Sequence, residues 1–317
     1  MKERPNIDAK YVDAVLRFNA FGPAQAPCRN GKESTQAGEL ERSTMPHPLL
    51  AILNHACYPN AISVFFSNIY TTRALCHLPV GTEIVHQYVK GEEPYAIRNA
   101  NLSKHGFDCG CLLCRLDRKD GMDNCAIRAR IVQGESKAIL DRSALLLMGG
   151  HDSQTPDTEA NRDIIESLDA LIERIRATYN KERGTLQPDL FTAIDARTRH
   201  LARKSTTDAV ISAKEALICA GAVINESDEG KILKVLPRLH FDSCLALMLF
   251  IATLLANDTS EKHSLRWTET AFWAHQCTIG GGSTNTKQAK ANVFLDRWDL
   301  KEFQPALEIH RKAVEKR

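Results

Sequence analysis

The sequence predicts an α+β protein, with short β segments around a cysteine cluster in the first part and an all-helical second part. Three observations support this fold class. Between residues 61 and 89, β-branched and aromatic residues form short runs separated by turn residues. Three cysteines lie between residues 109 and 114. From residue 163 onward, apolar residues recur every three or four positions, which is the period of a helix.

The length and composition favour a two-domain globular protein. The chain has 317 residues, is 43% hydrophobic and 25% charged, and carries a net charge of +2. Such a small net charge gives no electrostatic basis for binding nucleic acid or a membrane surface. We therefore expect a first domain at residues 1–118, a linker with a helical stretch at 119–162, and a helical domain at 163–317.

The location of the protein follows from its apolar segments and cysteines. The N-terminus shows no apolar signal segment, and the longest apolar run, Cys244 to Ala256, is too short to span a bilayer. The chain contains ten cysteines, which without a secretory signal indicate reduced thiols. We expect a nuclear or cytoplasmic protein that is not secreted.

The first domain is expected to contain a helix, a polar loop, three strands and a second helix. The sequence places them at 8–20, 25–47, 61–66, 69–76, 83–89 and 93–102. Ser67 and Asn68 form a tight turn between the first two strands. The segment Leu53–Asn60 favours neither helix nor strand, because Pro59 forbids continued helix. Its Asn54 and Asn60 are expected to hydrogen-bond the local backbone.

The second domain is expected to consist of helices stacked as in tetratricopeptide repeats. Its first helix carries an apolar stripe at Ile164, Leu168, Leu171, Ile175 and Tyr179. Asp208 and Ser260 are helix start signals. Further helices are predicted at 187–204, 208–224, 229–236, 238–256, 260–279, 285–297 and 300–316.

The cysteine cluster is typical of a structural metal site. Cys109, Cys111 and Cys114, in the pattern Cys-x-Cys-x-x-Cys, place three thiolates near one point. Structural Zn²⁺ takes four ligands, so a fourth must come from elsewhere, and Cys28, Cys76 and Cys125 are open as candidates beside the loop cysteine Cys57. The alternative is a small hydrophobic turn of buried cysteines without metal.

Three segments together resemble a known enzyme family. Leu53–Asn60, Gly81–Val89 and Phe107–Cys114, in this order and at these distances, resemble the catalytic half of a SET domain, the fold of most protein lysine methyltransferases. The Cys-x-Cys-x-x-Cys tail is similar to that of the SET–MYND proteins, which also carry a helical C-terminal domain. The resemblance covers about residues 12–116 and implies a partial SET-type β fold with a post-SET zinc site.

The resemblance implies S-adenosylmethionine as the methyl donor and a lysine-bearing protein or peptide, such as a histone tail, as the substrate. It also implies the residue roles. Cys57 completes the zinc site, Tyr88 is the catalytic tyrosine, Asn54, His55 and Phe107 bind the cofactor, and Phe21 and His105 line the lysine channel. Each of these residues also has an ordinary structural interpretation as a turn or packing residue, and for His86 we favour packing over a role as a base.

The chain also departs from the family pattern. No Gly-x-Gly turn lies upstream of residue 53, the MYND finger is absent, and Ala51 stands where serine is common. We therefore expect a SET domain without its N-terminal portion, either truncated or degenerate. Two functions remain open, an S-adenosylmethionine-dependent lysine methyltransferase and a catalytically inactive scaffold that binds peptides. A zinc module for nucleic acid is disfavoured, because no basic helix flanks the cysteines.

Overall fold

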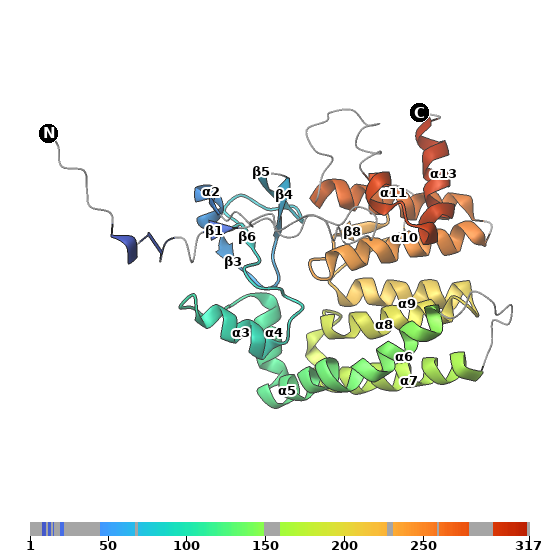
Figure 1. Cartoon of the computed structure of the whole chain (residues 1–317), viewed down its shortest axis with the longest axis horizontal. Helices are drawn as coiled ribbons and strands as arrows, with labels where there is room; N and C mark the ends of the chain where they lie inside the picture. Colours follow the sequence, from blue (N-terminus) through green and yellow to red (C-terminus); the bar gives the residue numbers. More distant parts are fainter. Residues whose placement is uncertain are drawn as a thin grey trace.

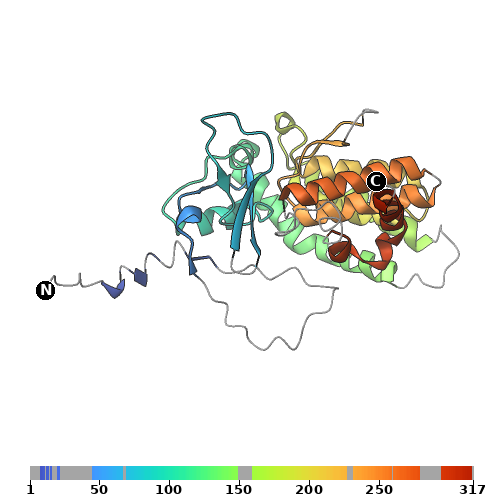
Figure 2. The same cartoon turned by 90° about the horizontal axis from the view of Figure 1, so that it is seen from above.

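The computed structural model describes residues 8–10, 12–13, 15, 20–21, 45–66, 69–148, 159–226, 231–258, 260–278 and 294–315. At residues 20–21, 45–46, 65–66 and 69 it describes the backbone alone. A small β-containing part and a larger helical part lie side by side (Figures 1 and 2). The described residues are mostly helical with small two-stranded sheets, which is consistent with the α+β prediction.

The predicted hairpin is present. Strands β4 (Ala61–Phe66) and β5 (Ile69–Ala74) pair antiparallel, with Ala61 opposite Ala74 and Phe66 opposite Ile69. This register is what a two-residue connection at 67–68 requires, although that turn lies outside the described residues. The β-branched and aromatic content of both runs explains why they form strands.

Two predictions about the neighbouring segments are wrong. The segment Leu53–Asn60 contains a strand, β3 (Asn54–His55), which pairs in parallel with β6 (Val85–His86). The strand predicted at 83–89 is therefore only two residues long. After His86, the backbone N–H of Tyr88 donates to the His55 side chain. On the other side, the Asn60 side chain binds the backbone of Glu83 and Val85. At both ends of β6, side chains therefore take the backbone hydrogen bonds that a neighbouring strand would otherwise make.

The N-terminal segments are described only in part. Residues 9–10, 12–13 and 15 are helical, but Ala20 and Phe21 form β1, which pairs with β2 (Met45–Pro46), so the helix predicted at 8–20 ends earlier. Residues 22–44, which include most of the predicted polar loop, lie outside the described residues. The short helix α2 (Pro48–Ala51) follows β2, and α3 (Tyr95–Ser103) confirms the helix predicted at 93–102.

Beyond the cysteine cluster, residues 112–148 are helical except for Gly121. They form α4 (Leu112–Asp120), α5 (Met122–Arg130), a π-helical turn η2 (Ile131–Glu135) and α6 (Ser136–Met148). Gly121, with a φ of 91°, turns the chain between α4 and α5 in a conformation that other residues rarely adopt. The domain limits at 118 and 162 stay predictions.

The helical part confirms most of the predicted helices. Helix α7 (Glu159–Arg176) begins the stripe from Ile164 to Tyr179, and all five stripe residues are buried. The start signal predicted at Asp208 is wrong, because Ser205 caps α9 by accepting a hydrogen bond from the backbone N–H of Asp208. The other elements are η3 (Lys181–Arg183), η4 (Pro188–Leu190), α8 (Phe191–Leu201), α9 (Thr206–Cys219), α10 (Phe241–Asn257), α11 (Glu261–Thr278), η5 (Lys301–Phe303) and α13 (Gln304–Glu315).

The helix predicted at 229–236 is wrong. This segment contains β8 (Leu233–Val235), which pairs antiparallel with β7 (Val223–Ile224). Leu233 is buried while Lys234 is exposed, which is the alternation of a strand, and Pro237 would have broken a helix continuing from this segment. Of the helix predicted at 285–297, residues 294–297 are helical and the remainder lies outside the described residues. The tetratricopeptide-like stacking stays a prediction.

The two parts are packed against each other. A large core fills the helical part, and a smaller core around the cysteines includes Leu186 and Leu239 from the helical part. The guanidinium of Arg238 lies 4.7 Å from the ring centroid of Tyr58, and the backbone N–H of His240 donates to Glu92 at 2.6 Å. No described helix has the length and apolarity to cross a membrane.

The stripe on α7 makes a first prediction. Leu168→Ala should lower the free energy of unfolding by about 2–5 kcal/mol, because the Leu168 side chain is fully buried and its loss leaves a cavity. Leu145→Ala on α6 is the control, since Leu145 is 69% exposed. Urea unfolding followed by circular dichroism measures both, and equal stability of the two variants would contradict the packing described for α7.

Candidate metal centre and neighbouring aromatic site

Four cysteines that are distant in the sequence meet at one point. Cys57 follows β3, Cys109 and Cys111 precede α4, and Cys114 lies in the first turn of α4. Their sulfur atoms all lie within 4.8 Å of one another, and those of Cys57 and Cys114 are 3.5 Å apart. The structure therefore places Cys57 with the three clustered cysteines, whereas Cys28 lies outside the described residues.

This cluster fits a tetrahedral metal ion. Zinc–sulfur bonds of about 2.3 Å place the four sulfurs roughly 3.8 Å apart, which these positions accommodate. Without a cation the four thiols have different pKa values, so they do not ionise together. Hydrogen bonds from Cys111 and Cys114 lower the pKa of Cys109, whereas the hydrogen bond with Cys109 raises that of Cys57. A divalent cation would let all four sulfurs ionise together.

The backbone around Cys57 is closely packed. The Gln87 side-chain amide donates to the carbonyl oxygen of Cys57 at 3.0 Å, and Gly91 approaches the same oxygen. A Cβ atom built on Gly91 would lie 2.1 Å from it, a distance that no side chain can occupy. Gly91 is therefore required for the chain to pass beside the metal centre.

His55 connects the cysteine cluster to Tyr88. Its Nδ1 accepts the backbone N–H of Tyr88 at 2.9 Å, and its Nε2 lies 3.2 Å from Cys57 Sγ. Because a backbone N–H can only donate, Nδ1 carries no proton, and the proton of the imidazole is on Nε2, where it points to the Cys57 sulfur. The buried imidazole thus fixes the position of Tyr88 relative to the metal centre.

Tyr88 lies at the centre of an aromatic group. Its ring centroid is 5.3 Å from that of His55, 5.4 Å from that of His105 and 6.4 Å from that of Phe107. Its hydroxyl donates to the carbonyl oxygen of Leu53 at 2.6 Å, and burial raises its pKa. Phe107 is 36% exposed, so part of its ring is available to a ligand. The structure brings these predicted site residues together, and their roles toward cofactor and substrate stay predictions.

The two asparagines of the loop bind the segment before β6. The side chain of Asn60 donates to the carbonyl oxygen of Glu83 at 2.8 Å and accepts the N–H of Val85 at 2.9 Å. The exposed Asn54 donates to the Glu83 carboxylate at 2.6 Å. The prediction of local hydrogen bonds is wrong, because these partners are more than 20 residues away. The asparagines instead join two distant segments of the site.

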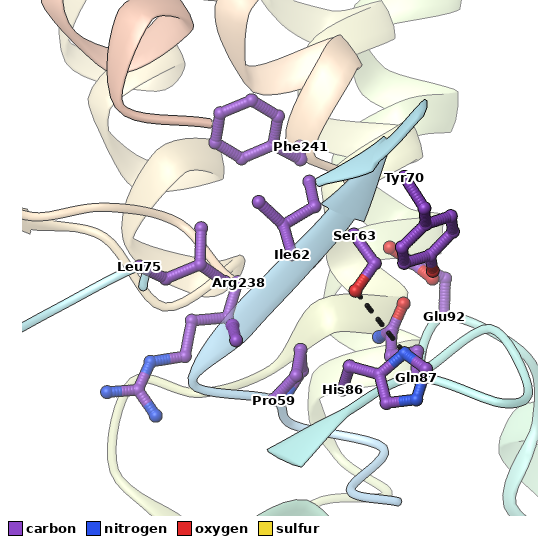
Figure 3. A pocket seen from close by; sticks show the side chains of 11 residues that line it. Pro59, Ile62, Ser63, Tyr70, Leu75, His86, Gln87, Glu92, Arg238 and Phe241 are labelled. Carbon is purple, nitrogen blue, oxygen red and sulfur yellow. Dashed lines mark hydrogen bonds between the residues drawn. The ribbon is translucent and has the colours of Figure 1, made fainter. Parts of the chain in front are cut away.

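His86 faces a small cavity beside this site. Burial lowers the pKa of His86 to about 4, so its imidazole is neutral at pH 7. Its Nδ1 lies 3.5 Å from the Ser63 hydroxyl (Figure 3). These contacts support packing rather than a role as a base.

The cavity has a volume of about 180 Å³ and lies between the strands and the start of α10. Figure 3 shows Tyr70, His86 and Glu92 grouped at one end of it, with the Arg238 guanidinium at the other. Neither Asn54 nor Tyr88 nor Phe107 lines this cavity. Phe21 lies in β1, but its side chain is outside the described residues.

Three residues of the site were not predicted from the sequence. Gly91 could have been identified from the sequence, since a single glycine between a strand and a helix often marks a close backbone approach. Gln87 and Arg98, which contact Cys57 and Cys114, could not have been identified in this way, because glutamine and arginine are usually exposed.

The close approach at Gly91 can be tested. Gly91→Ala should displace Cys57 and lower zinc content, with a loss of about 1–3 kcal/mol in the free energy of unfolding, because the added methyl overlaps the Cys57 carbonyl. Gly110→Ala is the matched control, since a Cβ there meets no atom within 4 Å. Metal analysis and urea unfolding measure both effects, and full zinc content in Gly91→Ala would count against this geometry.

No family model matches the chain. Curated proteins do. Over 127 residues the chain is 35% identical to the SET domain-containing protein SmydA-8, isoform A, of Drosophila melanogaster, which covers 37% of this chain and 25% of the relative. Over 90 residues it is 33% identical to human protein-lysine N-methyltransferase SMYD4, covering 27% of this chain and 11% of the relative. Over 113 residues it is 32% identical to histone-lysine N-methyltransferase ASHR1 of Arabidopsis thaliana, covering 33% of this chain and 24% of the relative.

These matches support the resemblance to the SET–MYND group of lysine methyltransferases. The matched segments amount to a quarter or less of the length of these relatives, 25% in the Drosophila protein and 11% in the human one.

Proposed function

We propose that the chain binds zinc and S-adenosylmethionine and acts as a protein-lysine N-methyltransferase. The observation that carries this proposal is the convergence of the Cys57 loop, Tyr88 and the Phe107–Cys114 segment around one metal centre. Its similarity to proteins named lysine methyltransferases supports the reaction class.

The metal has a structural role in this proposal. Cys57, Cys109, Cys111 and Cys114 hold zinc in a closed tetrahedral site, which leaves no position for substrate. One ion then fixes the loop after β3 to the start of α4. The imidazole of His55 contacts both Cys57 and the backbone N–H of Tyr88, so it fixes Tyr88 relative to this loop. The position of the aromatic group therefore depends on the metal.

The remaining residues bind and orient. Bound S-adenosylmethionine supplies a methyl group on a positively charged sulfur. Phe107 presents a partly exposed ring on which a planar base can stack, and Asn54 offers an exposed amide. The hydroxyl of Tyr88 and the carbonyl of Leu53, 2.6 Å apart, offer oxygen atoms that stabilise positive charge near the transferred group.

The substrate must reach the site as a neutral amine. A lysine side chain has a pKa of about 10.4 in water, so a neutral amine is formed by desolvation in an apolar channel. The lysine ammonium gives its proton to solvent before the transfer. The neutral nitrogen would then take the methyl group that S-adenosylmethionine supplies, with the carbon–sulfur bond breaking as the nitrogen–carbon bond forms. Phe21 and His105 are proposed to line this channel, with His105 lying 5.4 Å from Tyr88 between ring centroids.

The partner in this proposal is a protein or peptide that carries a lysine, such as a histone tail, in the nucleus or the cytoplasm. The helical part, which packs on the first part through Leu186 and Leu239, provides the surface that docks it.

The zinc site makes a direct prediction. Cys109→Ser should release about one zinc per chain and unfold the β-containing part, since the metal replaces much of the apolar core that this part lacks. Cys277→Ser, at a half-buried cysteine of α11, is the control and should keep its zinc. Metal analysis with near-ultraviolet circular dichroism measures both, and unchanged metal content in Cys109→Ser would rule out the site.

Cofactor binding and catalysis can be separated. Calorimetric titration of the zinc-loaded chain with S-adenosylmethionine should show binding that Asn54→Ala weakens and Asn101→Ala does not. Tyr88→Phe should reduce methyl transfer to histones far more than cofactor binding, because its hydroxyl orients the amine rather than the donor. Equal losses in both measurements would reassign Tyr88 to packing.

The titration also tests the alternative function. If the folded, zinc-containing chain binds no S-adenosylmethionine, the methyltransferase proposal fails and the inactive scaffold becomes the better description.

A further inference from the structure

A buried cluster of charged side chains lies directly beside the cysteines. It joins five elements and consists of Arg98 in α3, Asp117 and Asp120 in α4, Arg128 in α5, Arg183 in η3 and Asp189 in η4. All but Asp189 have side chains exposed by 4% or less, and Asp189 is exposed by 16%. We call these six residues the ionic cluster.

The ionic cluster is balanced by its own charges. Arg183 lies 2.7 Å from Asp117, and Arg128 lies 3.1 Å from Asp120 and 3.0 Å from Asp189. Asp117 and Asp120 also lie close to Cys125 in an arrangement that could hold a metal ion. Because arginines already supply the positive charge, these carboxylates form ion pairs rather than a second metal site.

Arg98 is the member that touches the metal centre. Its Nη2 is hydrogen-bonded to Asp117 and lies 4.0 Å from Cys114 Sγ. Its Nη1 donates to the carbonyl oxygens of Gly91 at 3.2 Å and Glu93 at 2.5 Å. One guanidinium thus contacts a cysteine ligand, the close-approach glycine and the ionic cluster.

The charge of the metal centre explains why an arginine lies there. Four thiolates outweigh one divalent cation, so the loaded site carries net negative charge in a buried position. Two side-chain nitrogens hydrogen-bond its sulfurs, His55 Nε2 to Cys57 and Arg98 Nη2 to Cys114. Neutral His55 donates without adding charge, whereas Arg98 is always cationic and offsets part of the negative charge.

We propose that Arg98 positions Cys114 in the metal site. We also propose that Arg98 couples metal occupancy to the packing of the η3–η4 segment against α4. The coupling runs through Asp117, whose carboxylate is shared by Arg98, Arg128 and Arg183. Loss of the metal releases the sulfur of Cys114, which Arg98 contacts, and so removes one of the contacts that hold this guanidinium beside Asp117. The inference rests on the proposed zinc site.

The first experiment measures metal affinity in the full chain by competition with a chelator. Arg98→Met should lower zinc affinity by roughly 10–100-fold, as is usual for residues that hydrogen-bond metal ligands. Arg115→Met is the matched control, since Arg115 is an exposed arginine beside Cys114 that donates to the carbonyl oxygen of Gly110. In the cobalt-loaded protein, Arg98→Met should also shift the thiolate-to-metal absorption band.

A conservative variant separates positioning from folding. Arg98→Lys keeps the positive charge beside Asp117 but lacks the planar guanidinium that reaches both Asp117 and Cys114. Its zinc affinity should therefore fall between those of wild type and Arg98→Met. A folded Arg98→Lys or Arg98→Met with the affinity and cobalt spectrum of Arg115→Met would overturn the positioning role.

The second experiment tests the coupling by hydrogen exchange. Removing zinc from the wild-type chain should increase amide exchange in residues 181–190 as well as around the cysteines. Arg98→Met should show raised exchange in 181–190 while still zinc-loaded. Exchange that changes only around the cysteines would overturn the coupling. A wild-type chain that binds no zinc would instead refute the metal site itself, and this inference with it.

Discussion

The rest of the β-containing part depends on four sulfur atoms held within 4.8 Å of one another. The strands around them are short, several of them two residues long, and such sheets are not stable alone in water. Its apolar core is also small and includes the cysteines themselves. A metal ion that joined Cys57 to Cys114 would close the chain segment holding β4, β5, β6 and α3, and would replace cohesion that the sheets do not supply.

The ionic cluster extends this constraint into the helical part. Arg128 and Arg183 both lie over the ring of Tyr179, at 4.2 and 4.6 Å, and Tyr179 ends the apolar stripe of α7. Burying such charges is costly unless every partner is present, so the cluster fixes one arrangement of α3, α4 and α5 against η3 and η4. Metal centre, ionic cluster and helical core therefore form one continuous buried system from Cys57 to the large core.

Local patterns predicted the elements whose burial is periodic. The stripe from Ile164 to Tyr179 and the hairpin of β4 and β5 depend on residues a few positions apart. The failures depend on distant partners. Asn60 and His55 take backbone groups near Val85 and Tyr88, which ends β6 early, and the segment at 229–236 pairs as a strand with β7. The resemblance, unlike a local pattern, linked distant residues that lie close in the structure, Cys57 with the three clustered cysteines and Tyr88 with Phe107, and their roles stay predictions.

The structure changes which residue distinguishes an enzyme from an inactive scaffold. Tyr88 alone does not, because its backbone binds His55 and its hydroxyl binds the Leu53 carbonyl, so folding needs it in either case. Phe107 is different. It follows a glycine, precedes the metal ligands and leaves 36% of its surface exposed beside the buried imidazole of His55. The exposed part of this ring is a surface on which a planar base could stack. Phe107 therefore supports the proposed cofactor site more than Tyr88 does.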